Sequence, residues 1–264
     1  MRQQPFKMTT TNAALSAEKQ ANGNVIEINH IKKAFGANVV LKDISLVVAK
    51  GENLVVMGKS GTGKSVLIKC LVRLIEADGG EIKMLGKNVP DLNENELTEL
   101  RKKTGFLFQS AALYDSMTVR ENLEFPLRDT DKKQEEVDAL VEEALKNVGL
   151  VDVIDKMPSE LSGGMRKRVG LARTLILRPE IILYDEPNTG LDPITTREIS
   201  KLIVELQHKY QTAAIVITHD GECARITGNR IMLINEGVCV AQGTYEELVN
   251  SKDEWVRSFF HKTD

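Results

Sequence analysis

The sequence predicts an α/β fold with a parallel-rich core, an antiparallel β region near its start and a helical insertion in its middle. Apolar strands alternate with helices over residues 181–218, which is the pattern of strands joined by crossover helices. Short strand-like runs at residues 25–28 and 44–48 come before the first helical pattern. A charged helical stretch over residues 118–148 separates these two parts.

The first half of the chain contains short strands around one glycine-rich loop. Residues 38–43 are interpreted as a turn between short strands, and Asp78-Gly79-Gly80 as another turn. After the loop, apolar residues at helical spacing predict a helix over residues 64–74. Strands are expected at residues 25–28, 44–48, 54–57, 81–85 and 105–108.

Helices and strands alternate in the second half. Pro126 is expected to end a helix that starts at Thr118, and a charged helix should follow over residues 131–148. Glu236-Gly237 predicts a hairpin between two strands. Strands are expected at residues 181–185, 213–218, 231–235 and 238–242. Helices are expected at residues 163–177, 193–209, 245–249 and 254–260, with a short one after Asp220.

The composition of the 264 residues is that of an ordinary globular chain, with 42% apolar and 28% charged residues. A formal net charge of −3 provides no general attraction to nucleic acid or anionic lipid, so we expect no nucleic-acid partner and any anion site must be local. No apolar run approaches the roughly 20 residues of a membrane helix, so action at a membrane would need another chain. The widely spaced Cys70, Cys223 and Cys239 are interpreted as buried or incidental thiols.

A phosphate-binding loop follows the strand at residues 54–57. Its pattern is G-x-x-x-x-G-K-[ST], formed by Gly58, Lys59, Ser60, Gly61, Thr62, Gly63, Lys64 and Ser65. Glycines let backbone N–H groups approach phosphate oxygens, and the helix that follows directs its positive dipole end at the anion. We expect Lys64 to contact the β- and γ-phosphates and Ser65 to bind Mg²⁺. The alternative is a glycine-rich turn with a solvated lysine.

Two adjacent carboxylates end the apolar strand at residues 181–185. Because open α/β sheets bind ligands at the carboxyl ends of their strands, Asp185 should lie beside the phosphate-binding loop. Asp185 is then a candidate ligand of Mg²⁺. Glu186 is a candidate general base for an attacking water. The alternative for this segment alone is a solvated acidic turn.

Leu161-Ser162-Gly163-Gly164-Met165 resembles the LSGGQ signature of ABC ATPases, with Met165 in the last place. Its serine hydroxyl and backbone N–H groups would form a second phosphate-binding pocket at the start of a helix. The resemblance implies a head-to-tail homodimer, in which each signature covers the ATP bound by the partner. The alternative for this segment alone is a serine helix cap followed by glycines.

Other family elements follow in order over residues 24 to 250. Phe35 resembles the aromatic residue that stacks on adenine, although alone it would be interpreted as a core aromatic. Gln109 resembles the Q-loop glutamine, which senses Mg²⁺ and water, and His219 the switch histidine that contacts the γ-phosphate. Leu191-Asp192 resembles the D-loop at the dimer interface. The family also implies nucleotide contact by Val66, directly after the phosphate-binding loop.

The resemblance implies the fold of a P-loop NTPase of the ABC type, with a RecA-like core, an antiparallel β subdomain and a helical subdomain. Residues 23–264 would form this single ATPase domain, with the helical subdomain at about 112–177 and a C-terminal tail at about 251–264. Residues 1–22 are polar and aperiodic and are predicted to be a disordered tail. The implied partners are integral membrane permease subunits, bound in a groove formed by residues 110–128, at the cytoplasmic face of the inner membrane. The apolar side chains of Leu113, Tyr114, Met117 and Phe125 would line this groove or instead pack the helical subdomain.

A narrower resemblance is to the ATPases of Mce-type, Mla-like phospholipid transport systems. It is carried by residues 109–119, by Phe125-Pro126-Leu127-Arg128, by Met165 and by the C-terminal residues 253–260. It implies lipid cargo and a lipid-binding Mce-type protein in the same complex. Asn188, Gly228-Asn229 and Lys59 depart from the usual family pattern without removing a catalytic group.

Two other classes of function remain open on the sequence. Other membrane-coupled ABC systems, for lipoprotein release, cell division or solute import, share the same motifs. A non-transport ABC ATPase of DNA repair or translation is the second alternative. Co-purification with an integral membrane protein or with nucleic acid discriminates between these classes.

Overall fold

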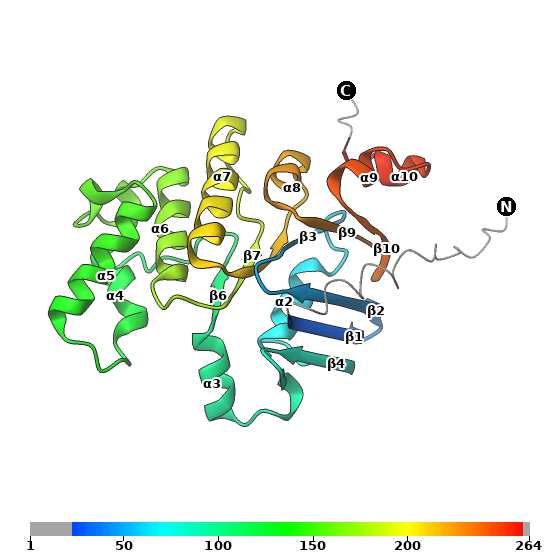
Figure 1. The fold of residues 1–264 in the computed structure, drawn as a ribbon, viewed down its shortest axis with the longest axis horizontal. Coiled ribbons are helices and arrows are strands. Elements are labelled where there is room, and N and C mark those ends of the chain that lie inside the picture. The colour runs from blue at the N-terminus through cyan, green and yellow to red at the C-terminus, as the bar shows by residue number, and fades with distance from the viewer. Residues whose placement is uncertain (1–22, 261–264) are drawn as a thin grey trace.

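The computed structural model describes residues 23–260, which form one ten-stranded sheet flanked by helices (Figure 1). The strand order is β5-β4-β1-β2-β10-β9-β3-β8-β7-β6. The strands are β1 Asn24–Phe35, β2 Asn38–Ala49, β3 Asn53–Met57, β4 Gly79–Met84, β5 Lys87–Asn88, β6 Thr104–Leu107, β7 Ile181–Asp185, β8 Ala213–Ile217, β9 Arg230–Asn235 and β10 Val238–Gly243. The tail predicted for residues 1–22 lies outside the described residues.

The sheet has two parts, as the sequence predicts. Strands β9, β3, β8, β7 and β6 are parallel, which gives the RecA-like core. Strands β2, β1, β4 and β5 pair antiparallel. Strand β10 pairs antiparallel with β9 and by one parallel bridge with β2, so it joins the two parts. The helical insertion, α4 to α6, lies at the far end from the antiparallel strands (Figure 1).

Helices cover both faces of this sheet. They are α2 Lys64–Leu71, α3 Glu94–Lys102, α4 Val119–Glu124, α5 Gln134–Asn147, α6 Gly163–Leu175, α7 Pro193–Tyr210, α8 Gly221–Thr227, α9 Tyr245–Val249 and α10 Glu254–Arg257. Short 3-10 turns are η2 Val89–Asp91, η3 Phe125–Leu127, η4 Val151–Val153 and η5 Pro158–Glu160. Within the described residues, no helix combines the length and apolar character needed to cross a membrane.

The turn predicted at residues 38–43 is wrong, because strand β2 runs unbroken from Asn38 to Ala49. The chain reverses earlier, at Gly36, where φ is +60° and glycine is favoured. Phe35 and Asn38 are therefore direct partners across the β1–β2 pair. The β-branched Val39 and Val40 favour the strand more than the polar Asn38 and Asp43 favour a turn.

Other predicted boundaries shift by a few residues. Helix α2 ends at Leu71 instead of residue 74, and α10 ends at Arg257 instead of residue 260. The helix before Pro126 ends at Glu124, and Pro126 lies inside η3. The hairpin at Glu236-Gly237 is confirmed, since both residues have positive φ between β9 and β10.

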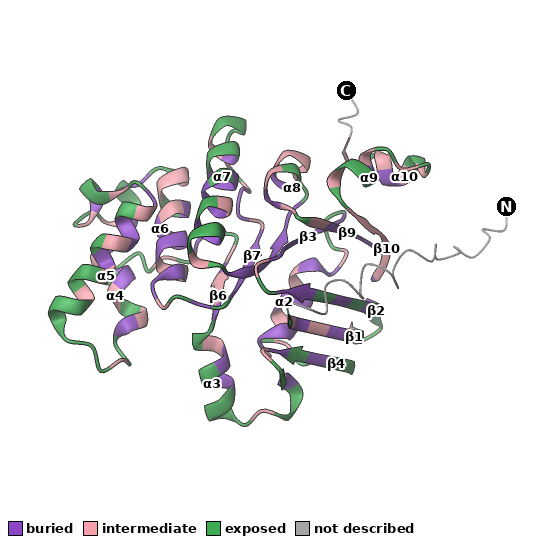
Figure 2. Cartoon of the chain, viewed as in Figure 1, coloured by how far each residue is buried: buried purple, intermediate pink, exposed green. Residues whose placement is uncertain are grey.

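Two apolar clusters form the core, one on each face of the parallel strands. Strand β3 is buried throughout, and its residues alternate between the clusters because successive side chains point to opposite faces. Val55 and Met57 join the cluster with the helical insertion, whereas Leu54 and Val56 join the one beneath the antiparallel strands. Figure 2 shows this buried centre, with exposed residues on the outer sides of the helices. The phosphate-binding loop therefore starts from a rigid strand.

Candidate functional site

The phosphate-binding loop joins the end of β3 to the start of α2, the context that the motif requires. Gly63 caps α2 with φ +94°, and a Cβ there would lie 2.7 Å from Leu41 Cδ2. A Cβ on Gly58 would lie 2.4 Å from the carbonyl oxygen of Ile234. Both positions therefore require glycine, and the loop is packed against strands β2 and β9.

Lys64 is buried within this loop. Its ammonium donates to the carbonyl oxygens of Gly58 at 2.8 Å and Lys59 at 3.0 Å. Burial lowers the pKa of Lys64, and the carboxylates of Glu186 and Asp185 oppose that shift. The amine is held by neutral oxygens of its own loop, so a phosphate can replace these contacts with charged ones.

The carboxylates of Asp185, the last residue of β7, and Glu186, the next residue, lie beside the loop. Ser65 Oγ donates to Asp185 Oδ1 at 2.7 Å. Glu186 Oε2 lies 2.8 Å from His219 Nδ1 and accepts from Thr189 Oγ1 at 3.2 Å. Strands β7 and β8 are adjacent and parallel, so the residues that follow them meet at one edge of the sheet. The first turn of α2 and the ends of two strands thus converge.

A cavity of about 890 Å³ opens at this edge, and we call it the first cavity. It brings together most of the predicted site residues. Its lining includes Gly58, Lys59, Ser60, Gly61, Gly63, Lys64, Ser65, Val66, Gln109, Glu186 and His219. Thr62 lines a neighbouring groove with Lys59, Ser60 and Gly61. The buried Asp185 reaches the first cavity through its hydrogen bond to Ser65.

The structure does not bring Phe35 into the lining of the first cavity. Its ring is 48% exposed near the β1–β2 turn, with the Lys33 ammonium 5.3 Å from the ring centre. Val40 of β2 lines the cavity on that side instead. Adenine stacking by Phe35 therefore stays a prediction.

The donor set at the Ser65–Asp185 contact suits Mg²⁺. A hydroxyl and a carboxylate meet there, and Gln109 from the segment after β6 lines the same cavity. Mg²⁺ prefers oxygen ligands and is held by one or two protein groups together with substrate phosphates. Among residues 23–260, no cluster of three histidine, cysteine or acidic side chains forms a metal cage. The chemistry fits a metal that arrives with a nucleotide.

The signature residues lie at a different place. Ser162 caps α6, and its Oγ accepts from Met165 N at 3.2 Å. Asp192 caps α7 beside it, and hydrogen bonds from Thr195 lower the pKa of Asp192. A Cβ on Gly164 would lie 2.8 Å from Thr195 Cγ2, so glycine lets the two helix starts approach.

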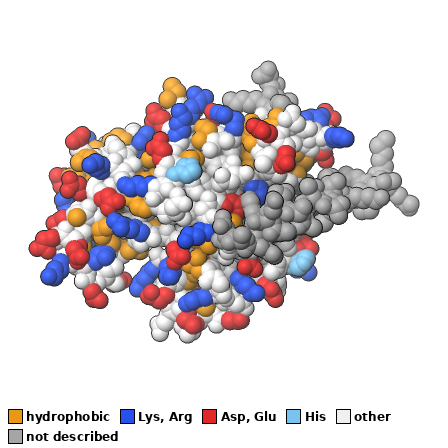
Figure 3. Space-filling view, viewed as in Figure 1, with side chains coloured by type: hydrophobic (Ala, Val, Ile, Leu, Met, Phe, Trp, Pro, Cys, Tyr) orange, Lys and Arg blue, Asp and Glu red, His pale blue; other side chains and the backbone are white. Residues whose placement is uncertain are grey.

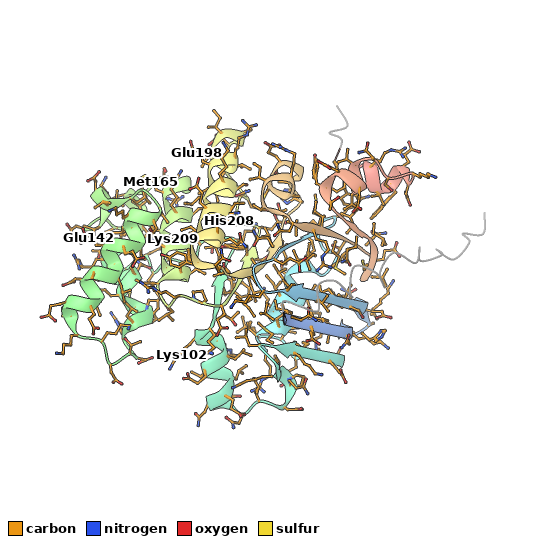
Figure 4. All side chains as sticks on the ribbon, viewed as in Figure 1. Lys102, Glu142, Met165, Glu198, His208 and Lys209 are labelled. Carbon is orange, nitrogen blue, oxygen red and sulfur yellow. The ribbon has the colours of Figure 1, made fainter. Side chains whose placement is uncertain are left out.

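These helix starts line what we call the second cavity, of about 340 Å³. It is lined by Ser162, Gly163, Gly164, Met165, Arg168, Gly190, Leu191, Asp192, Thr195 and Glu198, none of which lines the first cavity. Figure 4 shows Met165 and Glu198 near each other on α6 and α7. One chain therefore carries two separate polar cavities, each at helix starts.

Sequence reasoning missed four residues of the first cavity: Val40, Thr189, Ser258 and Phe259. Phe259 and Ser258 come from the C-terminal residues after α10, where the rings of Phe259 and Trp255 pack 4.6 Å apart. It also missed Lys167, which is buried on α6 and donates to the backbone carbonyls of Gln109 and Glu186. A lysine on the apolar face of the predicted helix at 163–177 was the available signal.

Of the four apolar side chains considered for the permease groove, Tyr114 and Phe125 are exposed, whereas Leu113 and Met117 are half-buried. Tyr114 is 43% exposed and Phe125 is 36% exposed, with their ring centres 4.6 Å apart. Arg128 lies 5.0 Å from the Phe125 ring centre. On the face shown in Figure 3, acidic and basic side chains are interspersed with small apolar areas over the helical end. This leaves an exposed aromatic pair beside the segment that carries Gln109.

Comparison with known proteins gives consistent matches. The sequence model of the ABC transporter family matches residues 41–189. The probable ribonucleotide transport ATP-binding protein mkl of Mycobacterium tuberculosis is 40% identical over 247 residues, covering 93% of this chain and 69% of that protein. The methionine import ATP-binding protein MetN of Clostridium tetani is 40% identical over 224 residues, covering 85% of this chain and 70% of that protein.

Solved structures share the fold. The protein cbiO1 of Clostridium perfringens, part of the ABC transporter complex cbiONQ, superposes with a TM-score of 0.81 at 28% identity, covering 87% of this chain and 92% of that chain. The dimeric ATP-binding cassette MJ0796, bound to ADP and Pi, has a TM-score of 0.75 at 32% identity, covering 83% of this chain and 98% of that chain.

Proposed function

Since this chain belongs to the ABC transporter family as an ATP-hydrolysing subunit, we propose that its first cavity binds and hydrolyses ATP with Mg²⁺. The observation that carries this proposal is the 2.7 Å contact between Ser65 and Asp185, which joins the phosphate-binding loop to the carboxylate at the end of β7. The loop N–H groups and Lys64 would hold the phosphates. Mg²⁺, when bound with ATP, would neutralise phosphate charge beside Ser65, Gln109 and Asp185.

We further propose that two copies act as a homodimer. The first and second cavities share no lining residue, which supports the closure of each cavity by a second copy. In a head-to-tail pair, the Ser162 cavity of one copy covers the ATP in the first cavity of the other. Each nucleotide then contacts the positive ends of two helices, α2 of one copy and α6 of its partner.

Hydrolysis is assigned to Glu186 and His219. Glu186 accepts a proton from the attacking water, whose oxygen bonds to the γ-phosphorus as ADP leaves. His219 positions the γ-phosphate, and its 2.8 Å contact to Glu186 holds both side chains at one end of the first cavity. Opening and closing of the dimer would transmit force to membrane subunits through residues 110–128.

The test is ATP hydrolysis by purified full-length protein carrying Glu186→Gln. Loss of the general base should lower kcat by roughly 10²–10⁴ while ATP binding is retained. Lys64→Ala should weaken nucleotide binding as well, because it removes a cation from the phosphates. Wild-type turnover in Glu186→Gln would remove Glu186 from this role.

For cargo, we propose phospholipid or another lipid, carried by permease and Mce-type partners at the cytoplasmic face of the inner membrane. The support is the resemblance at residues 109–128 and 253–260 to Mla-like ATPases. The relatives' names offer other cargoes, ribonucleotides and methionine. Affinity purification from detergent-solubilised membranes, with mass spectrometry of proteins and lipids, discriminates these. Recovery of a solute-binding importer without Mce-type protein would contradict the lipid assignment.

The resemblance to ABC ATPases supports a division of the chain. We propose that residues 112–177 move as a helical subdomain relative to the parallel core, and that residues 251–264 form a C-terminal tail. Helices α4 and α5 pack against α6, which supports one helical unit.

A further inference from the structure

Lys167 is a buried cation that the reaction described above does not use. It is 5% exposed on helix α6. Its ammonium donates to the carbonyl oxygen of Gln109 and, at 3.3 Å, to the carbonyl oxygen of Glu186. A buried ammonium is costly unless it is hydrogen-bonded, so these two carbonyls are what keep it there. One side chain thereby joins two backbone segments that come from different strands, β6 and β7.

Helix α6 holds the segment after β6 at three successive places. One turn beyond Lys167, a Cβ on Gly170 would lie 2.9 Å from Ala111 Cβ, so the backbones approach closely. Another turn on, Arg173 donates to the carbonyl oxygen of Ala111 at 3.0 Å. Residues three apart lie on the same side of a helix. Lys167, Gly170 and Arg173 therefore form one continuous contact surface for residues 109–111.

Both segments held by Lys167 have unusual backbone conformations. Glu186 has φ +50°, and Ala111 and Ala112 have φ +62° and +47°. Such conformations cost of order 1–3 kcal/mol per residue and persist only where the surroundings impose them. Contacts from α6 to the Gln109, Ala111 and Glu186 carbonyls are part of these surroundings, together with the bonds from Glu186 N to Ile217 O and from Ala111 N to Phe108 O. Helix α6 therefore helps to fix the backbones from which the Gln109 and Glu186 side chains project.

The electrostatic setting agrees with a cation at this position. Burial lowers the pKa of Lys167 to about 8, and the carboxylates of Glu186 and Asp185 act in the opposite direction. Both carboxylates favour the charged amine, and its hydrogen bonds to the two backbone carbonyls hold it in place.

We propose that Lys167 is a positioning residue for ATP hydrolysis, which ties the backbones of Gln109 and Glu186 to the helix that carries the second cavity. Ser162 caps α6 only five residues before Lys167, about 7.5 Å along the helix axis. Any displacement of α6 on nucleotide binding at Ser162 would then be passed through Lys167 to the backbones of Gln109 and Glu186 of the same chain. The inference rests on the proposed function of the first cavity.

The experiment compares Lys167→Met, Lys167→Gln and Lys167→Arg in the full-length chain, with Lys201→Met as control. Met and Gln have the same length, but only Gln keeps N–H donors for the carbonyls. Lys201 is an exposed lysine on α7. Steady-state hydrolysis gives kcat and KM, and a fluorescent ATP analogue gives Kd. We expect Lys167→Met to lower kcat about 10- to 100-fold and to leave Kd within about 3-fold of wild type. The Gln and Arg variants should recover part of the lost kcat. Lys201→Met should match wild type.

Hydrogen exchange provides a readout that does not depend on hydrolysis. In Lys167→Met, backbone amides of residues 109–112 and 186–190 should exchange faster, while residues 58–66 stay as in wild type. Wild-type kcat in Lys167→Met, or equal kcat in the Met and Gln variants, overturns the proposal, as does unchanged exchange in both segments. If Glu186→Gln keeps full turnover, the catalytic assignment fails, and the exchange result still decides whether Lys167 holds these backbones.

Discussion

Individual residues of the site show what a motif can and cannot reveal. The phosphate-binding loop was predictable because its glycines, Lys64 and Ser65 are adjacent in sequence, and adjacent residues need no long-range information. The positive φ of Glu186 and the contact of Ala111 with α6 were not predictable. Both arise from contacts between segments that are distant in the chain. The role of Lys167 was unpredictable for the same reason, because its hydrogen-bond partners Gln109 and Glu186 are 58 and 19 residues away in the sequence.

The three cysteines permit a prediction at the residue scale. Burial raises the pKa of Cys70, Cys223 and Cys239 to about 11 each. At pH 8 only about a thousandth of each thiol is then ionised, and the thiolate is the reactive form. Native protein should react with DTNB about 100-fold more slowly than the same protein in guanidinium chloride. Rapid release of one equivalent from native protein would contradict the burial of that thiol.

Elements with a clear run or spacing of apolar residues were predicted. Elements with few apolar residues, or with polar residues among them, were not. Strands β3, β7 and β8 are apolar over most of their length, so the parallel core followed directly. Helix α3 was missed because only Leu97 and Leu100 of its nine residues are buried, which leaves little periodicity to detect. Strand β2 was misread because polar Asn38 and Asp43 lie within a strand whose pairing with β1 is a tertiary property.

Helix α6 permits a prediction at the element scale. In Gly170→Ala, the new methyl group would lie 2.9 Å from Ala111 Cβ and 3.0 Å from Leu107 Cδ1. Overpacking of this kind costs about 1–3 kcal/mol, and the better helix propensity of alanine returns about 1 kcal/mol at most. Guanidinium unfolding should therefore show a net loss of stability. Gly79→Ala is the control, because a Cβ there meets nothing within 4 Å; equal stability of both variants would contradict the close approach.

At the scale of the whole molecule, the main feature is the separation of the first and second cavities. The signature motif alone predicted a second anion pocket, and the separation of the two pockets required knowing how α6 and α2 are placed around the sheet. That placement follows from strand order, with β7 and β8 between β3 and β6. A sequence pattern does not encode strand order locally, so only the family resemblance could supply it.

A substitution in the second cavity tests whether a dimer closes on ATP. Gly163 is the first residue of α6, and a Cβ there lies 3.5 Å from Leu191 Cδ2, an ordinary contact. Gly163→Asp should not disturb the monomer, because an acidic residue at a helix N-terminus is favourable by about 0.3–1 kcal/mol. In a dimer the same carboxylate would face the partner's phosphates, and like charges about 4 Å apart repel by roughly 1–4 kcal/mol.

In the Glu186→Gln background, MgATP should shift the 29.3 kDa chain to twice its mass in light scattering. Adding Gly163→Asp should weaken that shift about 10- to 100-fold in protein concentration, since the repulsion acts only across the interface. Adding Gly163→Ala, which introduces the same Cβ without the charge, should leave dimer formation near that of the parent. Binding of a fluorescent ATP analogue to monomer should be equal in all three proteins, because the first cavity is untouched. Equal dimerisation of the Asp and Ala variants would mean that the Ser162 cavity does not meet a partner's nucleotide.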